Sequence, residues 1–266
     1  MIITNNISPL RYPGGKTRAC KILDDIIQEY FNIYDIEILL SPFIGGGSFE
    51  FYFQNKYKKK IIANDKFTPL YNFWMQIKNN KELLYNELIK ISNISKEDFI
   101  NYRKNILNLN DNILEQSIYY FIINRCSFNG STLSGGFSEE ASKKRYTLSS
   151  IEKINKLNLD YIELYNLDFE DFILNNCNIN NSLLYLDPPY YLEKKSKLYG
   201  YNGDLHEEFD HIKLYNIIIT KKKWLITYNN CDYIKDLYKK FIIIEVNWSY
   251  SMNKSKKSSE IVIISN

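Results

Sequence analysis

Short apolar runs, each closed by a polar or glycine-rich turn, recur along most of this chain. Between most of these runs, apolar residues return at the three- and four-residue spacing of a helix, so the pattern predicts alternating strands and helices. Such alternation favours a parallel sheet with helices on both faces. One loop joins the last two runs, and no helix fits within it, so these two strands are expected to pair antiparallel. The strands are predicted at residues 36–40, 60–65, 161–165, 183–186, 224–228, 241–246 and 260–264.

A long helical segment interrupts the alternation in the middle of the chain. Apolar residues recur at helical spacing from Leu83 through Leu88, again from Phe99, and again up to Ile122. A chain of 266 residues is long enough for one large domain that carries such an insertion. Residues 81–147 are therefore predicted to form a helical insertion, and residues 1–80 and 148–266 to form one α/β domain.

The strand predicted at 183–186 ends in an acid, two prolines and an aromatic residue. Pro188 and Pro189 lack an N–H group and have a fixed φ, so the strand cannot continue through them. Asp187 and Tyr190 are therefore expected on a stiff turn at the carboxyl end of a strand, where ligands bind in open α/β sheets. Taken alone, the same residues also fit a strand that prolines terminate beside one exposed acid.

Two glycine-rich turns lie near the amino terminus, each followed by a helical pattern. The first includes Gly-Lys-Thr at 15–17, but Leu10 stands where a phosphate-binding loop needs its first glycine. The second, at 41–49, follows a predicted strand, an arrangement that lets a ligand approach the backbone closely. Glu50 occupies the third glycine position of a dinucleotide fingerprint, so this turn disfavours NAD or FAD.

Two acids follow predicted strands. Asp65 lies about 20 residues past the glycines, a separation that suits hydrogen bonding to a ribose diol. The alternative for Asp65 is an N-cap of the helix that starts near Thr68. Asp168 precedes another helical pattern and is in position to cap that helix.

Aromatic and basic residues gather in three segments that are predicted as loops. The first runs from Asn124 to Tyr146 through a sequence rich in Gly and Ser, the second follows Tyr190, and the third joins the last two strands. Basic residues suit phosphates, while aromatic rings and amides suit bases, so each loop is a candidate for contact with nucleic acid. A solvated surface loop accounts for the same composition. The candidate contacts are Arg125, Phe128, Asn129, Ser131, Lys143, Lys144, Arg145, Lys194, Lys195, Lys197, Lys254 and Lys256.

Composition excludes several classes of protein and selects no function by itself. A net charge of +3 permits nucleic-acid binding without arguing for it. The four cysteines are scattered and only two histidines are present, so neither a metal site nor a disulfide framework is expected. No segment has the pattern of a signal peptide or of a membrane span, so a cytoplasmic protein without membrane contact is expected.

The order of these motifs resembles that of the alpha group of DNA amino-methyltransferases, in particular the Dam-type, D12 class adenine-N6 enzymes. The matching segments are Tyr-Pro-Gly-Gly-Lys at 12–16, Phe-Ile-Gly-Gly-Gly at 43–47, Asn-Arg-x-x-Phe-Asn-Gly at 124–130 and Asp-Pro-Pro-Tyr at 187–190. The resemblance spans nearly the whole chain. It implies the Rossmann-like fold of a methyltransferase that depends on S-adenosylmethionine (SAM), with a helical insertion that recognises the DNA target.

The resemblance also implies which residues hold SAM, the methyl donor, whose product is S-adenosylhomocysteine. The glycine turn approaches its methionine part, Asp65 its ribose, and Asp168 with Phe169 its adenine. The family commonly has an acid where this chain has Ser41, so the contact to the SAM amino group is not defined. The implied cofactor-binding residues are Tyr12, Lys16, Pro42, Phe43, Gly45, Gly47, Ser48, Asp65, Asp168, Phe169 and Asp187.

The implied chemistry is methyl transfer to an exocyclic amine. Adenine N6 is a poor nucleophile because its lone pair is delocalised into the ring. Asp187 and the carbonyl of Pro188 can each accept one N6–H, which favours a pyramidal nitrogen and direct in-line attack on the methyl group. A base flipped out of the duplex would stack on Tyr190, which follows Pro189 in the catalytic turn.

Alternatives exist within and outside this class. Cytosine-N4 methylation uses nearly the same chemistry, although that group usually has Ser in place of Asp187. Enzymes that methylate glutamine side chains have Asn there, and an RNA adenine methylase would not need the insertion. A cytosine-C5 enzyme needs a cysteine that follows a proline, and this chain has none. A non-catalytic nucleic-acid-binding protein is the alternative from a different class.

Double-stranded DNA is the expected partner, and the protein is expected to be a monomer. The resemblance implies that Phe128 wedges into the duplex and that Asn129 lies near the flipped nucleotide. Beyond Gly130 the loop departs from Dam itself, so GATC is not implied as the target. A cognate restriction endonuclease is expected to act on the same site without direct binding, in a bacterial, phage or mobile-element setting.

Overall fold

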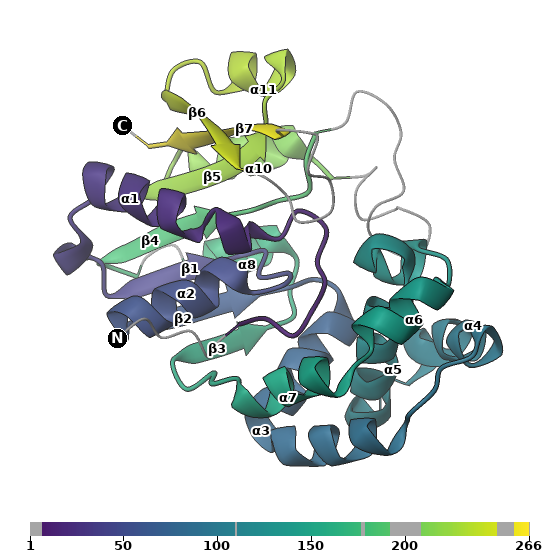
Figure 1. The fold of residues 1–266 in the computed structure, drawn as a ribbon. Helices are drawn as coiled ribbons and strands as arrows, with labels where there is room; N and C mark the ends of the chain where they lie inside the picture. The colour runs from purple at the N-terminus through teal and green to yellow at the C-terminus, as the bar shows by residue number, and fades with distance from the viewer. Residues whose placement is uncertain (1–6, 110, 177–178, 192–208, 249–257, 266) are drawn as a thin grey trace.

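The computed structural model describes residues 7–109, 111–176, 179–191, 209–248 and 258–265. Figure 1 shows a twisted sheet with helices on both of its faces, and a further group of helices beyond one edge of the sheet. Within the described residues, no helix is both long and apolar enough to cross a membrane.

The described residues form one seven-stranded sheet, in the order β3-β2-β1-β4-β5-β7-β6. The first five strands in this order pair in parallel, whereas β7 runs antiparallel to both of its neighbours. The predicted mostly parallel sheet with an antiparallel last strand is confirmed, and this strand lies inside the sheet. The strands are β1 (Ile38–Ser41), β2 (Lys60–Asn64), β3 (Ile162–Tyr165), β4 (Ser182–Leu186), β5 (Trp224–Asn229), β6 (Ile242–Trp248) and β7 (Ser258–Ile264).

The apolar strands bury both faces of the sheet, as a sheet between two layers of helices requires. In β1, Leu39 belongs to the hydrophobic core on one face and Leu40 to the core on the other. In β4, Leu183 and Tyr185 likewise belong to the first core and Leu184 to the second, because successive side chains point to opposite faces. Helices α1 (Cys20–Tyr30) and α2 (Ser48–Tyr57) pack on the first face, and α8 (Phe169–Asn176), α10 (His211–Ile218) and α11 (Asp232–Leu237) pack on the second.

The helical part of the molecule begins within α3 (Thr68–Lys90). This helix packs beside β3 and kinks at Asn80, where φ is −156°. Trp74, before the kink, and Leu84, after it, belong to the same continuous core. The predicted boundary at residue 81 falls at this kink, and the division into two domains stays a prediction. The other helices of this part are α4 (Lys96–Asn105), α5 (Ile113–Cys126), α6 (Glu139–Arg145) and α7 (Leu148–Lys156).

Part of the segment that was predicted as a flexible loop is helical. Residues 143–145 lie in α6, where Ser138 is the N-cap and its side chain accepts an N–H hydrogen bond. A helix of seven residues is too short to show a clear apolar period, which is why the pattern did not reveal it. Short 3-10 turns precede α6, and an antiparallel bridge between Ser127 and Phe137 closes them.

The amino-terminal segment is tied to the helical part. The Asn124 side chain accepts a hydrogen bond from the N–H of Arg11 at 2.8 Å and donates to the carbonyl of Arg11 at 2.7 Å. Arg125 donates to the carbonyl of Pro9 at 3.1 Å. Gly130 packs here with a φ of +70°, and a Cβ at this position would come within 2.5 Å of the Arg11 carbonyl oxygen. Residues that are 113 positions apart therefore hold the two parts of the molecule together.

Candidate active site

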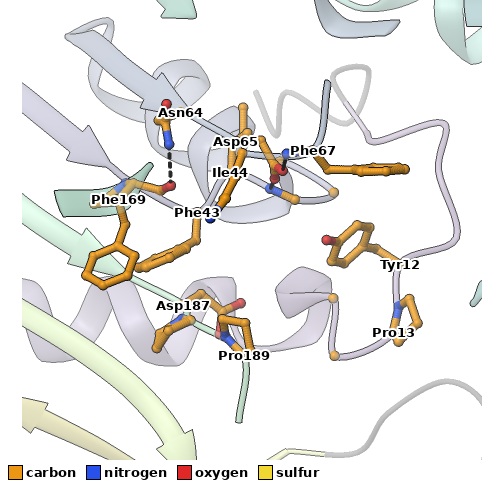
Figure 2. A pocket seen from close by; sticks show the side chains of 18 of the residues that line it. Tyr12, Pro13, Phe43, Ile44, Asn64, Asp65, Phe67, Phe169, Asp187 and Pro189 are labelled. Carbon is orange, nitrogen blue, oxygen red and sulfur yellow. Dashed lines mark hydrogen bonds between the residues drawn. The ribbon is translucent and has the colours of Figure 1, made fainter. Parts of the chain in front are cut away.

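A cavity of about 620 Å³ lies at the carboxyl ends of β1, β2 and β4. Its volume falls in the range of small-molecule sites. Figure 2 shows that the side chains around it come from well-separated segments and face a common space. From the helical part, Tyr120, Thr132 and Leu133 also line it. Every predicted cofactor-binding and catalytic residue lines this cavity: Tyr12, Lys16, Pro42, Phe43, Gly45, Gly47, Ser48, Asp65, Asp168, Phe169, Asp187, Pro188, Pro189 and Tyr190.

The glycine turn after β1 is shaped around Tyr12. Gly45 has a φ of +48°, and a Cβ there would lie 2.9 Å from the Tyr12 ring. At Gly46, a Cβ would lie 2.8 Å from the Cβ of Tyr12. The indole N–H of Trp74 donates to the carbonyl of Gly45 at 3.0 Å and so anchors the turn to α3. Tyr12 and the turn therefore form one continuous wall, which any larger side chain on the turn would disrupt.

Asp65, which directly follows β2, holds the glycine turn from the other side. Its carboxylate oxygens accept hydrogen bonds from the N–H of Gly45, at 3.1 Å, and from the N–H of Phe67, at 2.9 Å. Burial raises the pKa of Asp65 to about 6. The N-cap of α3 is Phe67, and no side chain caps this helix, so the alternative role of Asp65 as an N-cap is wrong. The carboxylate keeps acceptor capacity toward the cavity beyond these two hydrogen bonds.

Asn64 fixes the turns that follow β1 and β3, and the sequence pattern did not single it out. Its side-chain amide donates to the carbonyls of Pro42, at 3.1 Å, and Leu167, at 3.0 Å. Its Oδ1 accepts the N–H of Leu167 at 2.8 Å. A buried amide at the end of an apolar strand is the signal that would have found it, because such a group needs partners.

Asp168 caps α8 and also lines the cavity. One carboxylate oxygen accepts a hydrogen bond from the N–H of Glu170 at 3.1 Å, and the other pairs with Lys66 at 2.9 Å. The predicted cap is therefore present. A contact between Asp168 and a bound adenine stays a prediction, with which the remaining acceptor capacity of the carboxylate is compatible.

Three aromatic rings cluster at the same side of the cavity. The ring centroids of Phe43, Phe169 and Phe209 lie 5.2 to 5.8 Å apart. Phe209 lies next to α10 outside any predicted strand or helix, so its place in this cluster depends on the fold and not on a local pattern. Aromatic faces of this kind suit a planar purine.

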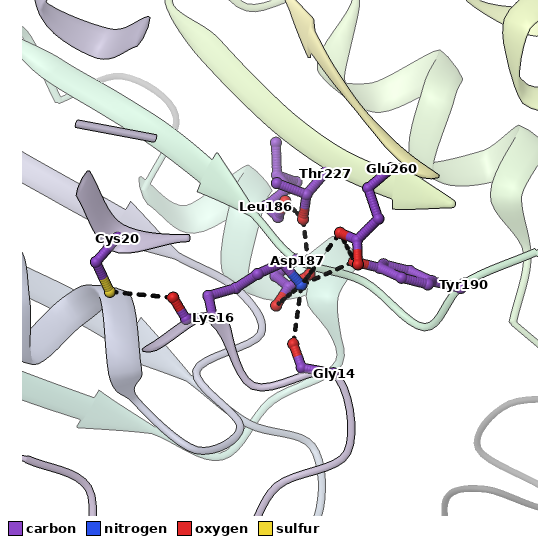
Figure 3. A network of polar contacts seen from close by, with 8 residues as sticks. All are labelled: Gly14, Lys16, Cys20, Leu186, Asp187, Tyr190, Thr227 and Glu260. Carbon is purple, nitrogen blue, oxygen red and sulfur yellow. Dashed lines mark hydrogen bonds and ion pairs between the residues drawn. The ribbon is translucent and has the colours of Figure 1, made fainter. Parts of the chain in front are cut away.

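Lys16 lies at the centre of a polar network although its side chain is only 3 % exposed. Its Nζ donates to both carboxylate oxygens of Asp187, at 2.7 and 2.9 Å. It also donates to the Tyr190 hydroxyl at 2.8 Å and to the Gly14 carbonyl at 3.0 Å (Figure 3). A buried ammonium group requires such partners. Lys16 thereby joins the amino-terminal glycine turn to the Asp-Pro-Pro-Tyr turn.

Two residues on the strands beyond β4 complete this network. Thr227, in β5, donates its hydroxyl to Oδ1 of Asp187 at 2.6 Å. Glu260, in β7, accepts a hydrogen bond from the Tyr190 hydroxyl and lies 3.8 Å from the Nζ of Lys16. Neither residue was in the predicted site. Both are polar residues inside apolar strands, which is the signal that could have found them.

The network holds Asp187 as a hydrogen-bond acceptor. Its Oδ1 accepts from both Lys16 and Thr227, and its Oδ2 accepts from Lys16. Burial, followed by the charges of Asp187 and Glu260, raises the pKa of Tyr190 well above its ordinary value. The Tyr190 phenol therefore stays protonated, and its hydrogen bond to Glu260 fixes the ring beside Asp187.

The residues predicted to contact DNA separate into exposed and buried ones. Phe128 is 63 % exposed although it is a large apolar residue, and Asn129 beside it has a φ of +54°. The Ser131 hydroxyl donates to the Phe128 carbonyl at 3.0 Å. This short turn therefore presents an aromatic ring to the outside, as a surface that docks on another molecule does.

Arg125, in contrast, is 8 % exposed. Besides its bond to Pro9, it donates from Nε to the carbonyl of Arg145 at 2.7 Å. Burial, followed by the charges of Arg11 and Arg145, lowers the pKa of Arg125 to about 10. In this position the guanidinium joins segments of the protein itself, and a contact with DNA would require it to leave these carbonyl groups.

The predicted basic cluster of Lys143, Lys144 and Arg145 forms the exposed end of α6. Lys143 pairs with Glu139 at 2.6 Å and Lys144 with Glu140 at 3.0 Å. These pairs offset much of the positive charge, so α6 is a weaker electrostatic surface than the sequence suggested. The other predicted contacts lie outside the described residues: Lys194, Lys195, Lys197, Lys254 and Lys256.

Potential metal ligands do not gather anywhere in the described part of the chain. No group of three or more His, Cys, Asp or Glu side chains there is placed to hold a metal ion. Cys20, Cys126 and Cys231 have free thiols.

The fold and the cavity together define a class of enzyme. A mostly parallel sheet carries a glycine turn after β1 and an Asp-Pro-Pro-Tyr turn after the adjacent β4, both on one cavity, which is the architecture of a SAM-dependent methyltransferase. The family model of D12 class N6 adenine-specific DNA methyltransferases matches residues 12–252. Because this match covers most of the chain, the protein belongs to that family and is an adenine-specific DNA methyltransferase.

Two related proteins are similar over nearly their full lengths. The type II methyltransferase M.CviBI of Paramecium bursaria Chlorella virus NC1A is 25% identical over 260 residues, which cover 91% of this chain and 90% of the relative. The type II methyltransferase M.MjaIII of Methanocaldococcus jannaschii is 24% identical over 261 residues, which cover 89% of each chain. The similarity therefore includes both the sheet and the helical part.

Proposed function

We propose that this protein is a site-specific DNA methyltransferase that transfers the methyl group of SAM to N6 of an adenine flipped out of double-stranded DNA. The transfer is direct and in line, without a covalent intermediate on the protein. The observation that carries this proposal is the position of Asp187. It lines the same cavity as the glycine turn, and Lys16 and Thr227 hold it as an acceptor.

The residues around the cavity fit SAM as the methyl donor. Asp65 offers a carboxylate suited to a ribose diol, and the rings around Phe43 suit an adenine. The Tyr185 hydroxyl is buried at this cavity and has no hydrogen-bond partner among the described residues, so the site retains a polar atom for a ligand. When bound, SAM supplies an electrophilic methyl group on a sulfonium.

On the acceptor side, Asp187 orients the amine. Because Lys16 and Thr227 both donate to Oδ1, Oδ2 has the greater capacity left for one N6–H. The carbonyl of Pro188 accepts the second N6–H. Together they favour a pyramidal nitrogen whose lone pair points at the methyl group. The neutral amine would attack the methyl group that SAM supplies, and the methylated amine would then release its extra proton to water. Asp187 therefore acts by orientation and not by prior deprotonation.

The base reaches this position only after it leaves the duplex, because a stacked adenine is inaccessible to the cavity. Tyr190 offers a ring to stack on, and its hydrogen bond to Glu260 holds that ring in place. Phe128, which is exposed next to Asn129, is suited to fill the gap that the flipped base leaves.

Product analysis tests the proposal. The protein is incubated with labelled SAM and unmethylated DNA, the modified nucleoside is identified, and the modified positions are mapped. N6-methyladenine within one defined sequence is the expected result. N4-methylcytosine would overturn the choice of base, and DNA that binds without becoming methylated would support the non-catalytic alternative.

A cellular assay tests the predicted link to restriction. DNA from cells that express the protein should resist one endonuclease whose site matches the mapped sequence, and DNA from cells that express Asp187→Ala should not. Equal cleavage of both DNA samples by every endonuclease that recognises the mapped site would contradict this link.

A further inference from the structure

One buried acid at the cavity has no role in the chemistry described so far. Glu50, in the first turn of α2, is 2 % exposed and lines the cavity. Its carboxyl accepts a 2.6 Å hydrogen bond from the hydroxyl of Ser41, the last residue of β1. A carboxyl group buried at a cavity wall requires a partner for its other oxygen as well, because burial removes it from water.

A second buried polar group lies at the same cavity. Tyr185, in β4, lines it, and the Tyr185 hydroxyl is closed off from solvent with no partner within the described part of the chain. Burial, followed by the charges of Asp187 and Glu50, raises the pKa of Tyr185 well above its ordinary value. The hydroxyl is therefore a protonated donor, and it lies within electrostatic range of the Glu50 carboxyl.

We propose that Glu50 and Tyr185 form the subsite for the amino-acid end of SAM: Glu50 binds the α-ammonium group, and the Tyr185 hydroxyl donates to the α-carboxylate. This inference rests on SAM being the methyl donor. Ser41 positions the acid by donating its hydroxyl to Oε1, and the backbone N–H of Glu50 also donates to the carboxyl; two such hydrogen bonds leave acceptor capacity for the ligand. Ser41 is neutral and cannot pair with the α-ammonium group of SAM, whereas the Glu50 carboxylate on α2 can.

The groups around Glu50 leave its charge for a ligand to neutralise. Within the described residues, Lys16 is the cation whose charge acts on Glu50, and the Lys16 ammonium already pairs with Asp187. Asp187 adds a negative charge. Cys20 adds none, because burial, followed by the charge of Glu50, raises the pKa of its thiol to about 12. A cationic ligand group is therefore the natural partner of an ionised Glu50.

Proton release is a consequence that can be measured. Burial raises the pKa of Glu50 to about 8, so the free protein holds this proton at neutral pH. An ammonium group favours the ionised carboxylate, so binding releases the proton below that pKa. The affinity for SAM should therefore rise with pH up to about 8, where the cost of ionising Glu50 disappears, and fall again at higher pH as the α-ammonium group of SAM loses its own proton.

Three ligands separate the two halves of the subsite in calorimetric titrations: SAM, decarboxylated SAM, and 5′-methylthioadenosine, which lacks the whole amino-acid end. Glu50→Gln keeps the shape and the acceptor for Ser41. It should weaken SAM and decarboxylated SAM alike, by about 30-fold or more, and leave 5′-methylthioadenosine unchanged. Tyr185→Phe removes only a hydroxyl. It should weaken SAM by about 10-fold and leave decarboxylated SAM unchanged.

The wild-type protein provides a test that needs no variant. Titrations at neutral pH in two buffers with different ionisation enthalpies should show proton release with SAM and none with 5′-methylthioadenosine. Equal proton release with both ligands would overturn the role of Glu50. Unchanged SAM affinity in Glu50→Gln would overturn it as well. An equal loss of affinity for all three ligands would show that Glu50 has a structural role only. Wild-type protein that binds none of them would contradict the proposed function itself, whereas normal SAM binding with unaffected variants contradicts the subsite alone.

Discussion

The cavity at the carboxyl ends of the strands and the surface predicted to face DNA are built in opposite ways. In the cavity, Lys16 reaches partners 171 and 174 positions away in the sequence. At the predicted DNA surface, Phe128 projects from one short turn, and Lys143 pairs with Glu139 four residues away. The cavity therefore depends on contacts across the whole fold, whereas the exposed side chains of the surface are placed by a short turn and by pairs within one helix, on a segment that packs on Arg11 at Gly130.

Arg125 belongs to the predicted DNA surface by sequence but to the long-range contacts by structure. It was grouped with the DNA contacts because it lies in the Asn-Arg-x-x-Phe-Asn-Gly segment at the start of a basic, aromatic loop. Its bonds to Pro9 and Arg145, however, are of the long-range kind that builds the cavity. Variants that separate transfer, stability and DNA binding therefore test whether the division is real.

The largest effect is expected from Asp187→Asn. The amide keeps the shape of the side chain and loses the charge that pairs with Lys16. Methyl transfer should fall by about 10² to 10³-fold in single-turnover assays, because one oriented acceptor for the N6–H is lost. SAM affinity should fall far less than transfer, and measuring it separates the two effects. Near-normal turnover would remove Asp187 from the proposed role.

Arg125→Ala should chiefly reduce stability. It leaves the carbonyls of Pro9 and Arg145 buried without their donor, so the free energy of unfolding should fall by about 2–3 kcal/mol in denaturant titrations. A variant that keeps full stability and loses DNA binding would show instead that Arg125 belongs to the DNA surface.

Phe128→Ala should show the reverse of Arg125→Ala. Removing an exposed ring should change the free energy of unfolding by less than about 0.5 kcal/mol. Binding of target DNA should weaken by about 10-fold, as loss of a ring stacked on a base does, while the affinity for SAM stays unchanged. Weakened SAM binding with intact DNA binding would mean that the helical part is assigned to the wrong ligand.

The smallest effect is expected from Lys143→Ala. Its charge is already paired with Glu139 on the exposed face of α6, so DNA affinity should change by about twofold or less, with little change in salt dependence. Lys144→Ala is the matched variant on the same helix. A loss above tenfold in either variant would show that the pairs open on binding and that α6 contacts phosphates.

The sequence was sufficient wherever chemistry and position are local. Asp187 to Tyr190 are contiguous, and prolines fix their turn, so their placement on the cavity followed from the motif. The parallel strands followed from continuous apolar runs. Thr227 and Glu260 could not be assigned in this way, because their roles depend on which strands lie beyond β4 and on how far along each strand the two residues fall. Local patterns contain neither fact.

The helical part also contains features that local sequence patterns do not predict. Its existence was predictable from apolar spacing, but α6 was not, and the charges within it looked unpaired until the helix brought Glu140 beside Lys144. Asn124 matched the family pattern, yet its actual task is to bind the backbone of Arg11, which nothing within either segment predicts.

The position of β7 has a consequence for biosynthesis. This strand follows β5 and β6 in the sequence but lies between them in the sheet, so it must insert after both have been made. Until it does, β5 presents an unpaired edge, and the Tyr190 hydroxyl lacks its acceptor Glu260. Translation proceeds at about 5–20 residues per second, so the nascent chain spends seconds in this state. Closing the sheet and completing the polar network around Tyr190 are therefore one folding event. A chain cut short before β7 should lack methyltransferase activity.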